Sequence, residues 1–372
     1  MAAAVPLVDL QAAHAEVAEE VREGFDRVLS SGAYIKGPDV AEFEAEYAAF
    51  SGVRHAVGTA NGTDALELAL RALELPEGAG VVLPANTFVA TAEAVVRAGL
   101  RPVLVDVDPA FLLTDPAAVA DRLGEAAALM PVHLNGQLAP MEQLLEVAGE
   151  LPVIEDGAQS QGALRHGRVS GSWGRISATS FYPGKNLGAY GDAGAVVTDD
   201  AELAKAVRLI GDHGSGVKYV HERFGFNSRM DTLQAVVLRA KLRRLPAWNE
   251  ARRTAAARYD ELLSGLDELG GLTTPLTMPG NEHVWHLYAV RLERGRDEVL
   301  AALQAEGIGA GVHYPVPVHL QPAFAHLGHG AGSFPVTEKA AGEILTLPLF
   351  PQITEDQQTR VAEVLAKALA RI

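Results

Sequence analysis

The chain has 372 residues, 48% of them hydrophobic and 21% charged, with 31 basic against 47 acidic side chains and a formal net charge of −16. These are the values of a globular protein, and the acidic balance argues against nucleic acid or an anionic membrane as a partner. The absence of cysteine excludes disulfides and thiol chemistry. The opening segment lacks the basic start of a secretory signal, and no apolar run reaches the length of a membrane helix. We therefore expect a cytoplasmic protein.

Short apolar runs alternate with helical patterns along the first part of the chain. The expected strands lie at 81–84, 102–107, 128–132, 152–155, 177–182 and 193–198. The expected helices between them lie at 63–75, 88–98, 139–149 and 201–210. This alternation predicts an α/β fold with a mainly parallel sheet covered by helices on both faces.

The last third of the chain is organised differently. A long helix is expected from Asp231 to Leu245, ending at Pro246. Beyond it we expect a helix at 248–265, a strand at 285–292, and helices near 296–306, 337–344 and 354–370. Since 372 residues exceed one ordinary core, the sequence predicts two domains, a large α/β domain at 1–246 and a small α+β domain at 247–372.

The segment 58–64 (GTANGTD) precedes an amphipathic helix and offers a phosphate site. The first amides of a helix are free donors at the positive end of its dipole, which suits phosphate. Gly62 and Thr63 are the candidates for these contacts, although an ordinary capped helix would look the same. Phe88, in the segment 84–91, could stack on a bound ring, whereas a single phenylalanine is more often part of the core.

Asp156 follows the expected strand at 152–155, at the edge of the sheet where open α/β folds bind ligands. A carboxylate there could keep a pyridine nitrogen protonated. Gln159 could point its amide at a hydroxyl of the same ring. Taken alone, Asp156 could equally be a helix cap.

Lys185 lies between a hydroxyl-bearing strand, which includes Ser180, and a glycine-rich turn. A lysine amine forms imines with carbonyls, including that of pyridoxal 5′-phosphate. An exposed loop lysine is the alternative interpretation. Together, Lys185 and Asp156 favour a pyridoxal phosphate site, because the carboxylate supplies the electronic partner that this cofactor needs. No metal site is expected, since His326 and His329 have no third ligand nearby in the sequence.

Six segments in order resemble the DegT/DnrJ/EryC1/StrS family of sugar aminotransferases, and the resemblance runs essentially end to end. They are 60–66 (ANGTDAL), 131–136 (PVHLNG), 155–160 (EDGAQS), 180–188 (SFYPGKNLG), 225–231 (GFNSRMD) and 313–319 (HYPVPVH). The resemblance implies a fold type I enzyme dependent on pyridoxal phosphate. Some relatives replace the lysine with histidine and catalyse dehydration, whereas Lys185 leaves the transaminase route open.

The resemblance also implies roles for individual residues. Lys185 would bind the cofactor and move the proton, Asp156 would pair with the pyridinium, Gln159 would bond the ring oxygen and Phe88 would stack on the ring. Gly62, Thr63 and Ser180 would hold the phosphate, and Asn227 would reach the phosphate of a partner subunit in a homodimer with shared active sites. Arg229, His313 and Tyr314 would lie near the sugar nucleotide.

By the same resemblance, L-glutamate donates the amino group to a nucleotide-linked keto sugar. The segments 284–288 and 314–322 resemble members that act on 3-keto sugars, which favours a dTDP-linked 3-keto-6-deoxyhexose. A UDP-linked 3-keto uronate, gripped by Arg229, and 4-amination of a 4-keto sugar are the alternatives. A non-catalytic regulator on the same fold is a further alternative, against which the set of Lys185, Asp156 and Gln159 argues.

Overall fold

The computed structural model describes residues 4–266 and 271–372. Seven strands form its central sheet, in the order β1, β9, β8, β5, β4, β2, β3. Their bounds are His55–Thr59 for β1, Gly80–Pro84 for β2, Arg101–Val105 for β3, Ala128–Leu129 for β4, Ile154–Asp156 for β5, Ile176–Ser180 for β8 and Gly194–Thr198 for β9. Parallel bridges from Leu129 to Val153 and from Val132 to Asp156 join β4 to β5. Only β9 runs antiparallel to its neighbours, so the predicted, mainly parallel α/β sheet is confirmed.

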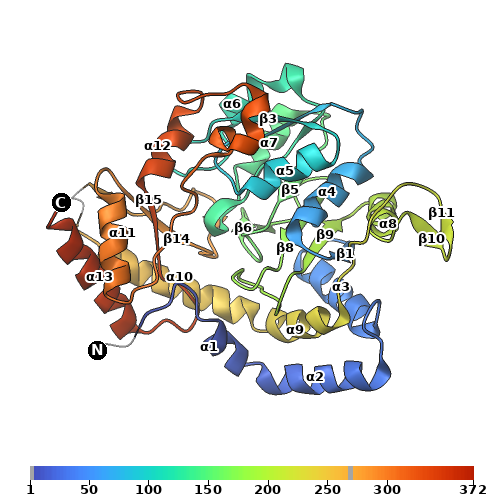
Figure 1. Cartoon of the computed structure of the whole chain (residues 1–372), viewed down its shortest axis with the longest axis horizontal. Coiled ribbons are helices and arrows are strands. Elements are labelled where there is room, and N and C mark those ends of the chain that lie inside the picture. Colours follow the sequence, from blue (N-terminus) through green and yellow to red (C-terminus); the bar gives the residue numbers. More distant parts are fainter. Residues whose placement is uncertain (1–3, 267–270) are drawn as a thin grey trace.

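Helices cover both faces of this sheet, as Figure 1 shows. Apolar side chains alternate along β2, so Val81 and Leu83 pack toward one face and Val82 toward the other. On the first face lie α4 (Gly62–Ala72), α5 (Val89–Arg97) and α8 (Ala201–Ile210). On the second lie α3 (Pro38–Phe50), α6 (Pro116–Ala120), α7 (Met141–Ala148) and α9 (Thr232–Leu242). This double cover leaves the strand ends as the open edge where a ligand can enter.

The C-terminal region builds a second core on an antiparallel sheet. Its strands are β12 (Leu272–Thr273), β14 (Tyr288–Leu292) and β15 (Ile344–Leu347), with β14 in the middle. Its helices are α10 (Leu245–Leu262), α11 (Arg296–Ala305), α12 (Pro335–Glu343) and α13 (Glu355–Leu369). The expected helices and strand of this region are therefore present.

Two expectations about elements were wrong. The helix expected from Asp231 to Leu245 is present as α9 but already ends at Leu242, and Pro246, expected to end it, lies in the first turn of α10. Proline is tolerated there because the first amides of a helix have no intrahelical partner. The strand β1 was also missed. The predicted division at 246/247 stays a prediction, and it does not account for Val5, which packs in the C-terminal core and bridges to Ile308.

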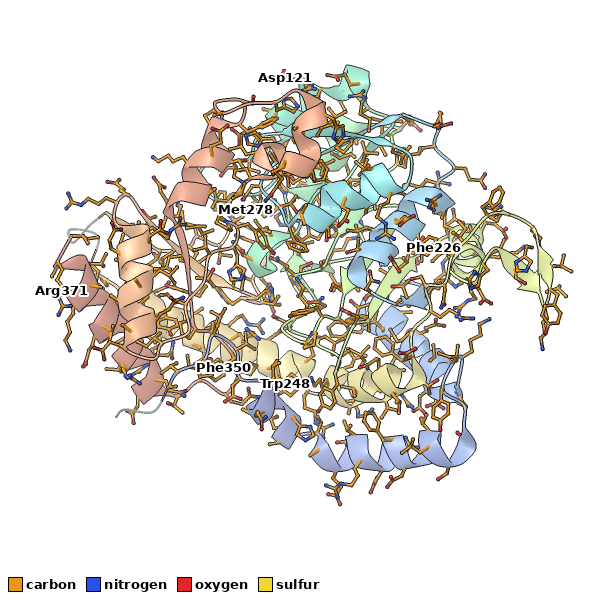
Figure 2. The ribbon with its side chains drawn as sticks, in the orientation of Figure 1. Asp121, Phe226, Trp248, Met278, Phe350 and Arg371 are labelled. Carbon is orange, nitrogen blue, oxygen red and sulfur yellow. The ribbon has the colours of Figure 1, made fainter. Side chains whose placement is uncertain are left out.

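The N-terminal region wraps along the outside of the molecule through α1 (Leu10–Ala15) and α2 (Ala18–Ser31). Trp248 on α10, labelled in Figure 2, donates its indole N–H to Glu16 Oε2 at 2.9 Å. Just before α1, Leu7 and Val8 reach the central cavity. The N-terminal segment therefore connects the C-terminal core to the wall of the site.

Short paired strands complete the structure. They are β6 (Leu164–Arg165), β7 (Arg168–Val169) and β13 (Asn281–Glu282) in one small sheet, and β10 (Ser215–Val217) and β11 (Val220–His221) in a hairpin. Figure 1 shows this hairpin projecting from the body of the molecule beyond α8. Within residues 4–266 and 271–372, no helix is both long and apolar enough to cross a membrane.

Candidate active site

A cavity of about 550 Å³ lies at the carboxyl ends of the parallel strands. Nine of the residues predicted for the site line it: Gly62, Thr63, Phe88, Asp156, Gln159, Ser180, Lys185, His313 and Tyr314. The other two, Asn227 and Arg229, lie in a smaller neighbouring depression. The structure therefore gathers residues from both cores around one space.

Lys185 is presented by a tight turn after β8. Its amide donates to Tyr182 O at 2.8 Å, and the buried Lys241 donates to Gly188 O at 2.7 Å on the other side of the turn. Burial lowers the pKa of the Lys185 amine to about 8, although the charge of Asp156 opposes the shift. An amine with this pKa is partly unprotonated near neutrality and can act as a base or a nucleophile.

Asp156 ends β5 and is buried at the cavity floor. Its Oδ2 accepts from Thr91 Oγ1 at 2.8 Å, and its Oδ1 accepts from the Ala158 amide at 3.1 Å. Burial raises the pKa of Asp156 above its ordinary value, while these hydrogen bonds and the charge of Lys185 oppose the rise. Burying the charged carboxylate costs free energy, and a cationic ring nitrogen in the cavity would offset this cost by pairing with it.

Gln159 and Tyr314 form a polar pair on the cavity wall. Gln159 Oε1 accepts from the Asn135 amide at 2.7 Å, so Nε2 is the end that donates to the Tyr314 hydroxyl at 3.1 Å. Burial raises the pKa of Tyr314 to about 12, so its hydroxyl keeps its proton and can donate it to a ligand. The Phe88 ring lies 5.3 Å from the Tyr314 ring, centroid to centroid, and is 51% exposed, as expected of a ring that covers a ligand.

The start of α4 lies against the end of β8. Asn61 caps the helix by accepting from the Asp64 amide at 2.8 Å, while Gly62 and Thr63 occupy the first turn, whose amides have no intrahelical acceptor. A Cβ on Gly62 would lie 2.5 Å from Ser180 Cβ, so only glycine allows this close approach. The arrangement brings free amides and a hydroxyl together, which is the chemistry of a phosphate site.

Asn227 and Arg229 do not face the main cavity. Asn227 bridges to Asp212, and Arg229 Nη1 donates to Asp212 Oδ1 at 2.8 Å. Lys36 also pairs with Asp212. Within this chain Arg229 is thus held by a carboxylate, and its expected contact with the sugar nucleotide stays a prediction.

Two cavity residues were missed from the sequence. Thr91, which holds Asp156, follows Phe88 by three residues at the start of α5, and that helical spacing was an available signal. His286 lies buried in the wall, 8% exposed, and only the tertiary fold brings it beside Lys185. Both residues lie in segments that the sequence analysis considered, 84–91 and 284–288, but neither side chain was singled out there.

The residues present fit pyridoxal phosphate. The cavity offers a lysine amine, a buried carboxylate for the ring nitrogen, an exposed aromatic ring for stacking and a close-packed helix start for the phosphate. Burial raises the pKa of Asp156, and no residue that the structure describes forms an ion pair with it. A pyridinium nitrogen would form such an ion pair.

Comparison with known proteins gives the same assignment. The model of the DegT/DnrJ/EryC1/StrS aminotransferase family matches residues 15–366. A dTDP-3-amino-3,4,6-trideoxy-α-D-glucose transaminase of Streptomyces venezuelae is 44% identical over 99% of this chain and 97% of its own length. A UDP-N-acetyl-3-dehydro-α-D-glucosamine 3-aminotransferase of Acidithiobacillus ferrooxidans is 45% identical over 98% of both chains. A protein of Geobacillus stearothermophilus, 44% identical over 98% of both chains, is named a pleiotropic regulatory protein.

Among solved structures, S. venezuelae DesV in complex with a ketimine intermediate superposes with a TM-score of 0.95. It is 44% identical, and the match covers 100% of both chains. The expected fold, that of the pyridoxal phosphate-dependent aminotransferases, is therefore confirmed.

Proposed function

Since the chain belongs to the DegT/DnrJ/EryC1/StrS aminotransferase family, we propose that it transfers the amino group of L-glutamate to a nucleotide-linked 3-keto sugar, with pyridoxal phosphate as cofactor. The chain is an aminotransferase, and the placement of Lys185 and Asp156 in one cavity carries the proposal for its cofactor.

The cofactor, when bound, supplies a carbonyl that carries the amino group and a pyridinium ring that withdraws electrons from the carbon losing or gaining a proton. Asp156 would hold the positive charge of the ring nitrogen, because a buried carboxylate favours a cation beside it. Thr91 and Ala158 orient the carboxylate through one hydrogen bond to each oxygen. This fixes the carboxylate before any ligand arrives.

Lys185 is the base of the proposed mechanism. With its lowered pKa, the free amine would be able to take up a proton at the reacting carbon of the substrate and to give it up again. Gly62, Thr63 and Ser180 would hold the phosphate, Phe88 would cover one ring face and Gln159 Nε2 would donate to the ring oxygen. His313 and Tyr314 would contact the sugar.

The relatives favour a 3-keto sugar. Both the Streptomyces and the Acidithiobacillus names place the amino group at C3 of a nucleotide-linked hexose. We propose a dTDP-linked 3-keto-6-deoxyhexose as substrate, with a UDP-linked 3-keto sugar as the alternative. In both named sugars C2 carries a hydrogen-bond donor, a hydroxyl in the first and an acetamide N–H in the second.

Charge supports a homodimer with shared sites. Among the described residues that line the cavity, Lys185 is the only lysine or arginine, although the cofactor phosphate and a nucleotide diphosphate are both anionic. The hairpin of β10 and β11 exposes apolar side chains, Tyr219 at 84% among them, and carries Lys218 nearby. We propose that a second copy covers these surfaces and brings Asn227 and further basic groups to the cavity.

The test is an absorption spectrum of the purified protein, recorded before and after addition of L-glutamate. The proposed function predicts a band near the visible edge that glutamate converts to the pyridoxamine form. A protein that remains colourless after addition of pyridoxal phosphate would contradict the cofactor assignment. A coloured protein inert to glutamate would favour another donor or the regulatory role that the Geobacillus name suggests.

A further inference from the structure

His286 belongs to a chain of hydrogen bonds whose direction is fixed by two backbone carbonyls. Asn249 Nδ2 donates to Gln161 O at 2.9 Å, which leaves Asn249 Oδ1 to accept from Asn186 Nδ2 at 3.0 Å. Asn186 Nδ2 also donates to Val284 O at 2.8 Å. Since both hydrogens of this amide are used, Asn186 Oδ1 must be an acceptor.

The acceptor determines the tautomer of His286. Its Nδ1 lies 3.3 Å from Asn186 Oδ1, so Nδ1 carries the hydrogen and donates it. Burial and then the positive charges of Lys185 and Arg252 hold the pKa of His286 well below its ordinary value, so the ring is neutral. A neutral imidazole with Nδ1–H has a lone pair at Nε2.

This lone pair has no partner among the residues that the structure describes. No described residue makes a hydrogen bond to Nε2, and this nitrogen is not sealed among protein atoms, because the ring lines the cavity. The other cavity histidine differs, since the Thr346 hydroxyl beside His313 Nδ1 can donate or accept and leaves its tautomer open. His286 is therefore a dedicated acceptor in the wall of the cavity, which Tyr314 also lines.

The His286 ring lies near Lys185, the residue proposed to move the proton at the reacting carbon. Asn186, which holds His286, directly follows Lys185, and the charge of Lys185 reaches both His286 and His313. An imidazole that resists protonation is a poor base but a good acceptor for a neutral hydroxyl or amide N–H. A sugar offers such groups, whereas its ketone oxygen offers none.

We propose that Nε2 of His286 accepts a hydrogen bond from the donor on C2 of the sugar, beside the reacting C3, and that His286 thereby selects the sugar substrate. The inference rests on the proposed function, and its test separates the two halves of the reaction. Glutamate carries no such group at the corresponding place, so its half-reaction does not use this contact.

Two substitutions test the hydrogen bonds of the two ring nitrogens separately. His286→Asn keeps an amide N–H for Asn186 but places nothing at the Nε2 position, whereas His286→Gln places an amide oxygen near that position. The probe is dTDP-3-amino-3,4,6-trideoxy-α-D-glucose, run in the reverse direction on the holoenzyme in single turnovers. The C2 hydroxyl is the only hydroxyl left on this sugar, so its 2-deoxy analogue removes the proposed donor.

We expect His286→Asn to lower kcat/KM for the aminosugar about tenfold, the loss of one hydrogen bond, and to slow the glutamate half-reaction much less than this. His286→Gln should recover part of the loss. Wild-type enzyme should discriminate against the 2-deoxy analogue by a similar factor, and His286→Asn should not. Equal losses in both half-reactions, or discrimination that persists in the variant, would overturn the assignment.

Two further measurements distinguish a failure of this inference from a misfolded variant and from a failure of the proposed function. In ¹⁵N-histidine spectra of the holoenzyme, the signal that His286→Asn removes should be a neutral Nδ1–H ring between pH 6 and 8, and a protonated or Nε2–H ring would refute the argument. The wild-type reactions with glutamate and with the aminosugar test the proposed function by themselves. The discrimination against the 2-deoxy analogue needs no variant, so a misfolded variant leaves the inference testable.

Discussion

Glu155 provides a prediction whose size can be worked out from the structure. Its carboxylate is fully buried beside Asp156, and each oxygen accepts two hydrogen bonds. Oε1 accepts from the amides of Trp173 and Gly174 at 2.7 and 2.6 Å, and Oε2 accepts from His133 Nε2 and the Gly171 amide at 2.9 and 2.8 Å. Burial raises the pKa of Glu155, but these donors outweigh it and hold the pKa below its ordinary value.

Glu155→Gln preserves the shape of the side chain and replaces one oxygen with an amide nitrogen. Whichever way the amide turns, two donors lose their acceptor. His133 cannot adapt, since its Nδ1 already accepts from the Ala139 amide at 3.2 Å and its Nε2 must keep the hydrogen. At about 1–3 kcal/mol for each of the two donors left unpaired, the free energy of unfolding should fall by about 2–6 kcal/mol.

Thermal unfolding followed by circular dichroism measures this loss. At about 2 cal/mol/K per residue, a chain of this length should melt about 5 °C lower. Hydrogen exchange should accelerate locally at the amides of Gly171, Trp173 and Gly174. Because the pKa of Glu155 is lowered in the fold, its stabilisation is present above the unfolded value of 4.5 and is lost as the pH falls through the folded pKa.

The matched control is Glu202→Gln on α8. The side chain of Glu202 is 84% exposed and its ion pair with Lys205 spans 4.0 Å, so the melting temperature should hardly change. If Glu155→Gln melts within a degree of the wild type, or if exchange at 171–174 is unaltered, the hydrogen-bond argument is wrong.

Four more outcomes are expected. Lys185→Ala should abolish the glutamate-dependent spectral change, with a loss of at least about 10²-fold, and any wild-type-like rate would exclude Lys185 as the base. In the wild type, the single-turnover rate of the sugar half-reaction should rise with pH, reach half of its maximum near pH 8 and level off above that, because burial lowers the pKa of Lys185 to about 8 and the base must be unprotonated. A rate that is still rising steeply at pH 10 would contradict this. Gly62→Ala should weaken cofactor affinity in an equilibrium titration, since its Cβ would lie 2.5 Å from Ser180 Cβ, whereas Gly342→Ala, with nothing within 4 Å, should bind normally. Mixing Lys185→Ala with Asn227→Ala subunits should restore activity above that of either variant alone if sites are shared across a dimer, and mixtures no better than the separate variants would count against shared sites.

The sequence predicted those parts of the fold that depend on local pattern. The strands β2, β3 and β9 are mainly apolar runs between turns, and their length and flanking residues suffice to identify them. β1 was missed because its five residues include histidine and glycine and continue into the glycine-containing start of α4. Pro246 was interpreted as the end of a helix, although the same residue fits the first turn of the next one.

The sequence predicted those site residues that combine a reactive side chain with a position next to a strand of the central sheet. Lys185 and Asp156 each follow a strand, so parallel pairing alone brings them to one edge of the sheet. His286 could not be found in this way, because its position depends on contacts between Asn186, Asn249 and Val284, which are far apart in the sequence. Contacts of this kind arise only from tertiary packing.

The bridge between Val5 and Ile308 has a consequence for how the molecule is made. The two residues are about 300 positions apart, yet the Val5 amide donates to Gly307 O and Val5 O accepts from the Gly309 amide. On a ribosome the sheet of strands β1 to β9 can pair before the partner of Val5 has been synthesised. Leu7 and Val8 therefore close the cavity wall late, after most of the chain has emerged. Because of this order of synthesis, the cavity stays open until the C-terminal core forms. A nascent chain stalled before Ile308 would contain Lys185 and Asp156 in a cavity whose wall is incomplete.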